Sequence, residues 1–261
     1  MILKLIKYDV KKILDFLIYF YVISLGLAMI TRLISIGNEI QFIYIIEKVF
    51  AGITYASIAQ ILVNIFTQTL RVFVCDFYKD ESYLTHTLPV TKNQLLLSKY
   101  ISSLIIIVIS ITICFIDLFV VLYTPEFFES LKLLINVVVT GFDIKAWLFV
   151  LIIALIILFQ VCAMTSIAFS AVVKSNTYNS QRALKGFIWF FIYYFASGLV
   201  TLLTCVIVFA ISGNLSNLFA QVMPQSAFIT LLLVALICNF LYSFIFYFIC
   251  NKLFTKGVNV D

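Results

Sequence analysis

The chain has 261 residues, of which 64% are hydrophobic and only 11% are charged, and its formal net charge is +5. A soluble domain carries about 25% charged and 45–50% apolar residues, and a domain of this size cannot hide so much apolar surface in its core. The composition therefore excludes a soluble globular fold and predicts that lipid surrounds most of the chain. The basic residues lie in ones and twos between apolar runs, which excludes a nucleic-acid partner.

The first predicted element is a short amphipathic helix over residues 1–13. Its apolar and basic residues recur at helical spacing on different faces: Ile2, Ile6, Val10 and Ile13 on one, and Lys4, Lys7 and Lys11 on another. A helix of this kind lies in the headgroup plane, where apolar burial and anionic membrane lipid both hold it. The alternative is a short basic lead-in that only orients the first span.

Six apolar segments are long enough to cross the bilayer as helices, since about 20 residues span roughly 30 Å of hydrocarbon. They cover residues 14–36, 43–74, 97–123, 146–173, 186–212 and 226–252. The predicted fold class is therefore all-α, a polytopic membrane protein with a single transmembrane domain over residues 1–261. With both termini in the cytoplasm, 13 of the 17 basic residues lie on the inner side. The positive-inside rule therefore predicts this orientation.

The segment over residues 76–96, between the second and third spans, is the most informative part of the sequence. Pro89 lacks an amide hydrogen and disfavours helix at the residue before it, so a charged helix of about 78–87 must end there. Thr91 is well placed to cap the helix that leads into the third span. The segment is thus tied at both ends to spans, and a force on it would tilt the two spans together.

This same segment carries a resemblance to a known family. Acidic and basic residues are followed by Tyr-Leu-Thr, Leu-Pro-Val-Thr, Leu-Leu and Ser-Lys, a pattern that resembles the segment after the second span in type-2 ATP-binding-cassette (ABC) exporter permeases. An amphipathic amino-terminal helix, six spans and cytoplasmic termini match the same architecture. The resemblance implies a coupling helix that docks on a separate cytoplasmic ATPase. By position, the residues that would meet the ATPase are Tyr78, Lys79, Asp80, Glu81, Ser82, Tyr83, Leu84 and Thr85.

A solvated loop that merely joins two spans is the alternative for this segment. The resemblance further implies a permease subunit that exports an amphipathic or hydrophobic substrate, such as a peptide or a lipid-like molecule. It would pair with a second copy or a paralogue in the cell membrane, as a multi-pass protein of the bacterial plasma membrane. ATP and magnesium are expected on the partner ATPase, and no cofactor, metal or catalytic residue is expected in this chain.

The rival prediction is an autonomous protein, either an ion-coupled secondary transporter or a membrane scaffold. A coupled carrier should have ionisable residues deep in several spans, and Asp117 is the carboxylate that lies well inside a predicted span. An acid there costs roughly 2.5–3.5 kcal/mol at mid-helix, so it usually faces a cavity or a partner. We expect Asp117 to reach water near the outer end of the third span. Two roles stay open: a pathway or gating residue, and a structural pair with Arg32.

Two outer segments complete the prediction. Residues 125–140 combine apolar and charged positions in a pattern that suits an amphipathic helix on the outer surface. The link over 213–225 carries no charge, and in the resembled family this connection dips back into the membrane as short re-entrant helices. The sequence permits such an insertion here without requiring it.

Overall fold

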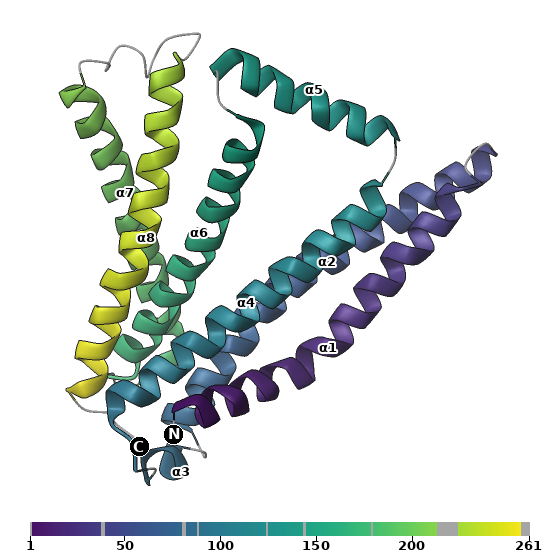
Figure 1. The fold of residues 1–261 in the computed structure, drawn as a ribbon. Coiled ribbons are helices and arrows are strands. Elements are labelled where there is room, and N and C mark those ends of the chain that lie inside the picture. The colour runs from purple at the N-terminus through teal and green to yellow at the C-terminus, as the bar shows by residue number, and fades with distance from the viewer. Residues whose placement is uncertain are drawn as a thin grey trace. The chain divides into compact units, whose positions relative to one another are not determined.

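The computed structural model describes residues 2–37, 40–79, 82–87, 89–123, 125–142, 145–178, 180–212 and 224–256. The regular structure in these ranges is helical (Figure 1): α1 (Ile2–Ser35), α2 (Gln41–Tyr78), α3 (Ser82–Thr87), α4 (Lys92–Leu122), α5 (Pro125–Phe142), α6 (Ala146–Ser175), α7 (Arg182–Ile211) and α8 (Gln225–Thr255). Among the described residues, six helices are long and apolar enough to cross a membrane, namely α1, α2, α4, α6, α7 and α8. The all-α class is confirmed for the described residues, and each of the six predicted spans falls on a helix that is long and apolar enough to cross a membrane.

The amino-terminal segment is continuous with the first span. The sequence predicted a separate helix over 1–13, whereas α1 runs as one helix from Ile2 to Ser35. Figure 1 shows its first turns at an angle to the remainder. Its buried residues recur every three or four positions, beginning with Ile6, Asp9, Ile13 and Leu17. This stripe packs on neighbouring helices, since α1 contacts both α2 and α4.

The helices form two compact units, Met1–Phe128 and Glu129–Asp261. In the first unit α1, α2 and α4 pack on one another, and α3 packs on α2. Polar side chains connect these helices at several levels, through the pairs Asp9–Lys99, Tyr21–Ser110 and Thr31–Thr54. The first two pairs differ by about 90 in residue number, so α1 and α4 run parallel and in register. Small and hydroxyl side chains at such contacts allow close approach of membrane helices.

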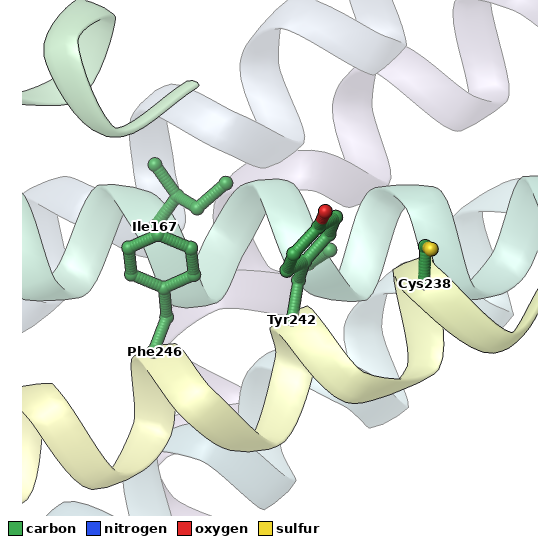
Figure 2. Packing of buried hydrophobic residues seen from close by; sticks show 5 residues of the cluster. Ile167, Cys238, Tyr242 and Phe246 are labelled. Carbon is green, nitrogen blue, oxygen red and sulfur yellow. The ribbon is translucent and has the colours of Figure 1, made fainter. Parts of the chain in front are cut away.

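In the second unit α6 packs on both α7 and α8. A buried cluster joins α6 to α8 (Figure 2), and its members are Ala163, Ile167, Cys238, Tyr242 and Phe246. Two aromatic pairs extend the same contact, Phe149–Phe228 and Phe159–Phe240, with ring centroids 6.3 and 5.2 Å apart. In each pair the residue numbers differ by about 80, so α6 and α8 are parallel and in register along their length.

The two predicted outer segments have different outcomes. The segment over 125–140 lies within α5, which is helical from Pro125 to Phe142. The link over 213–225 lies almost entirely outside the described residues, so its re-entrant geometry stays a prediction.

Candidate functional site

The segment between α2 and α4 contains a shorter helix than the sequence predicted. α2 continues to Tyr78, and Lys79 is extended, with φ −119° and ψ −159°. The Ser82 amide then donates to the Lys79 carbonyl at 2.8 Å, and α3 begins at Ser82. The predicted single helix over 78–87 is therefore wrong in its first turn, because the backbone of Lys79 leaves the helical region. Asp80 and Glu81 lie outside the described residues.

The predicted start of the next helix is confirmed. The Thr91 hydroxyl accepts a hydrogen bond from the Gln94 amide at 3.3 Å, and the Gln94 side chain accepts one from the Thr91 amide at 3.1 Å. This reciprocal arrangement is a capping box, which satisfies two backbone donors at the start of α4. The beginning of α4 is therefore fixed by a cap that lies two residues after Pro89.

The predicted docking residues differ in exposure. Lys79 is exposed, the Tyr83 side chain is 71% exposed, and Tyr78 and Thr85 are half-buried. Ser82 is fully buried, so its side chain faces the interior of the first unit. The backbone of Leu84 is part of α3, while its side chain lies outside what the structure describes. Among the described side chains of α3, Tyr83 is thus the large aromatic one that lies on the surface.

The most distinctive site of the first unit is a charge cluster formed by Asp9, Lys12, Asp76 and Lys99. The Lys99 ammonium donates to Asp9 Oδ1 at 2.6 Å and also to Asp76 Oδ2. The Lys12 ammonium donates to Asp76 Oδ1 at 3.0 Å. Asp9, Asp76 and Lys99 are 2%, 4% and 7% exposed. Two positive and two negative groups balance, which is the condition for placing charges in such a dry environment.

The cluster joins three helices at one level. Asp9 lies on the buried stripe of α1, Asp76 is two residues from the end of α2, and Lys99 lies near the start of α4. The Lys99 ammonium also lies 5.9 Å from the ring centroid of Phe77, within the range of a cation–π contact. The two helices that flank α3 are therefore bound to each other, and to α1, beside the segment predicted to couple to an ATPase.

Sequence reasoning missed this cluster. It counted Lys99 among the cytoplasmic charges and treated residues 1–13 as an apolar face beside a lysine face. A signal was present, because Asp9 falls between Ile6 and Ile13 on the apolar stripe. An acid at such a position requires a basic partner, although the identity of that partner depends on a contact across 90 residues.

Asp117 and Arg32 are not a pair. Arg32 donates to the Ser35 hydroxyl at 3.2 Å and lies 5.7 Å from the ring centroid of Tyr123. Tyr123 is six residues beyond Asp117, roughly 9 Å along the helix axis. The register of α1 against α4 sets Asp117 beside Ser24 instead. The predicted pairing of Asp117 with Arg32 is therefore wrong.

The environment of Asp117 is dry. Its side chain is 0% exposed, so the predicted access to water is also wrong. Neither carboxyl oxygen makes a hydrogen bond of normal geometry among the described residues, and the adjacent Ser24 hydroxyl donates to the Tyr21 carbonyl at 3.0 Å. A buried acid in a span is by default a functional-site hypothesis, so Asp117 is a candidate functional residue.

Comparison of the chain with models of protein families, with curated proteins and with solved structures finds no match. The fold itself defines the class, a multi-pass helical membrane protein. The charge cluster, α3 and Asp117 are the features of that fold on which a functional proposal can stand.

Proposed function

We propose that the chain is the membrane-spanning permease subunit of an ABC exporter, driven by a separate cytoplasmic ATPase and paired with a second copy or a paralogue. The observation that carries the proposal is the position of α3. This short helix lies between α2 and α4 and exposes Tyr83, and the flanking turns of α2 and α4 meet in the charge cluster. The resemblance of residues 76–99 to the coupling segment of such permeases supports the same function.

In this mechanism the ATPase pushes or pulls on α3. A buried ion pair costs about 3–5 kcal/mol to break when one partner is removed, so the contacts between Lys99 and the two aspartates resist separation of their helices. Displacement of α3 would therefore move α1, α2 and α4 as one body. The ATPase supplies the energy through ATP and magnesium, and this chain converts the displacement into a change of access across the membrane.

The distribution of charge supports the proposed orientation. We place both termini in the cytoplasm, so that the charge cluster lies at the cytoplasmic ends of its helices and α3 faces the ATPase. The exposed Lys4, Lys7 and Lys11 on the first turns of α1 suit contact with anionic headgroups. We further propose that the protein resides in the bacterial plasma membrane and that it exports an amphipathic or hydrophobic cargo, either a peptide or a lipid-like molecule.

Co-purification tests the proposal. A tagged chain would be expressed in its native host, extracted in mild detergent, and compared with a variant that combines Asp80→Ala, Glu81→Ala and Tyr83→Ala. The matched control is Tyr8→Ala, because Tyr8 is an exposed tyrosine of the same unit, 63% accessible, that lies outside the coupling segment. We expect an ATPase to accompany the wild type and Tyr8→Ala but not the triple variant. Recovery of the ATPase with all three would refute the docking residues, and its absence from all three would refute the permease.

A second candidate is an ion-coupled secondary transporter, and the buried Asp117 favours it. A carrier of this class moves a proton or cation through an intramembrane carboxylate. The expected result for a carrier is substrate movement in vesicles that contain this chain alone and an ion gradient, with loss of movement in Asp117→Asn. Transport that requires an added ATPase would exclude this candidate. If the chain transports nothing under either condition, a membrane scaffold is the remaining interpretation.

A further inference from the structure

The second unit contains a cavity of about 730 Å³ between α6, α7 and α8. Small-molecule sites usually have volumes of 300–1,000 Å³ and a mainly apolar lining with a few polar groups. This cavity fits both criteria, since most of its lining residues are aliphatic or aromatic. It is separate from the charge cluster and from α3, which both belong to the first unit.

The cavity exists because α7 packs loosely. Along the fully described α7, Phe209 is the buried residue, whereas α6 buries most of its residues from Cys162 to Val173. A Cβ atom built at Gly198, which lines the cavity, would meet no other atom within 4 Å. The contacts of α7 with α8 include two hydrogen bonds of the Tyr242 hydroxyl, which donates to the Ser197 carbonyl at 3.0 Å and is bonded to the Thr201 hydroxyl. A ligand could therefore occupy the space beside Gly198 without displacing packed side chains.

Two side-chain amides line this apolar cavity at the same level. Gln160 and Asn239 lie near the middle of α6 and α8. Their numbers differ by 79, which matches the in-register spacing of the pairs Phe149–Phe228 and Phe159–Phe240. The two amides therefore face the cavity at one depth, close to the centre of the helices.

Neither amide has a hydrogen-bond partner among the described residues, in contrast to Tyr242 and Thr201, whose hydroxyls are bonded to each other at 3.0 Å. An amide without a partner in an apolar environment is costly, and this cost is recovered if a ligand supplies the missing donors and acceptors. A side-chain amide offers both, so the complementary ligand group is another amide. The described residues that line the cavity carry no charge, so a charged ligand would find no counter-ion among them.

We propose that this cavity binds an uncharged, apolar molecule that carries an amide group, with Gln160 and Asn239 as its polar anchors. A fatty acid amide and a short hydrophobic peptide share this chemistry. The binding itself is independent of the ATPase; the further statement that such a molecule is the exported cargo rests on the proposed function.

Photolabelling of the full-length chain in nanodiscs of zwitterionic phospholipid tests the proposal. The probe is a long-chain primary amide with a diazirine in its alkyl chain, and the labelled residues are identified by mass spectrometry. Two variants disturb the cavity in different ways: Gly198→Phe fills it, and the double variant Gln160→Leu, Asn239→Leu removes the anchors. The matched control is Gln60→Leu, since Gln60 is an exposed glutamine of α2 in the first unit.

We expect saturable labelling of residues from α6, α7 and α8 that line the cavity in the wild type and in Gln60→Leu. Labelling should be lost in Gly198→Phe, and the half-saturation concentration should rise about fivefold or more in the double variant, as for loss of ordinary hydrogen bonds. Thermal unfolding without probe separates binding from folding, because the double variant should melt no lower than the wild type. Competition by an unlabelled fatty amide or by an end-blocked hydrophobic tripeptide then identifies the source of the amide.

Labelling that is unchanged in Gly198→Phe, or that is equal for a diazirine hydrocarbon without the amide, would overturn the proposal. The test is independent of the co-purification experiment. Saturable labelling without an associated ATPase would support the ligand site and refute the permease assignment. An associated ATPase without labelling would support the permease assignment and refute the ligand site.

Discussion

Substitution of Lys99 by Met is the sharpest perturbation of the first unit. Met has a similar length and keeps the apolar stem of the side chain, but it removes the ammonium that joins α4 to α1 and α2. Asp9 and Asp76 would remain buried, at 2% and 4% exposure, with the ammonium of Lys12 on Asp76 Oδ1. The variant therefore keeps the shape of the site and unbalances its charge.

The expected loss of stability follows from this burial. Removal of one partner from a buried ion pair costs about 3–5 kcal/mol, because the remaining charge is left uncompensated. The double variant Lys99→Met, Asp9→Asn keeps the Asp76–Lys12 pair and restores the balance, so it should recover most of the loss. Lys92→Met is the matched control: Lys92 is an exposed lysine in the first turn of the same helix, and its replacement should stay within about 0.5 kcal/mol of the wild type.

Equilibrium unfolding in mixed detergent micelles measures these differences. The maleimide reactivity of Cys114 follows the first unit specifically, because this buried thiol lies on α4. A background in which the other five cysteines are replaced by Ser or Ala makes the signal unambiguous. Equal stability of Lys99→Met and Lys92→Met would refute the structural role of the cluster. A double variant as unstable as Lys99→Met would show that charge imbalance is not the cause of the loss.

Three further predictions use the same assay or its hydrogen-exchange counterpart. Thr91→Ala should destabilise the first turn of α4 by about 1 kcal/mol through loss of the cap, seen as faster exchange of the Gln94 amide, while Thr91→Ser should leave the exchange rate unchanged. Tyr21→Phe removes the hydrogen bond to Ser110 and should cost about 0.6 kcal/mol, as is typical between membrane helices; a loss above roughly 2 kcal/mol would contradict this. Asp117→Asn should stabilise the first unit or leave it unchanged, since a neutral amide is cheaper to bury than an isolated carboxylate; a clear loss of stability would contradict the dry, unpaired environment.

The helical spans could be predicted because lipid imposes one rule along the whole chain. A backbone in hydrocarbon must satisfy its own hydrogen bonds, so each apolar run of sufficient length becomes a helix. The cap at Thr91 was predictable for the same local reason, since Pro89 ends one helix and a hydroxyl two residues later begins the next. The boundary at Lys79 was not, because nothing in its side chain disfavours helix.

The charge cluster could not be assembled from the sequence, because its members belong to three helices. Lys99 meets Asp76 across 23 residues and Asp9 across 90, and such contacts depend on the register of α1, α2 and α4. The register of α1 against α4 also explains why Arg32 and Asp117 do not pair. Proximity to the outer ends of two spans suggested a pair, but parallel packing of α1 and α4 brings Arg32 to Tyr123.

The interiors of the two units suit different tasks in the proposed exporter. The first unit joins its spans by balanced charges and interhelical hydrogen bonds between side chains such as Thr31 and Thr54, 2.9 Å apart. Contacts of this kind are directional, so a small rotation breaks them. The second unit holds α6 to α8 by apolar packing and leaves α7 beside a cavity, and apolar contacts tolerate sliding because they have no preferred direction. If one part transmits a displacement as a rigid body and another adapts to a ligand, the rigid part is the unit that carries α3 and the adaptable part is the unit that contains Gln160 and Asn239.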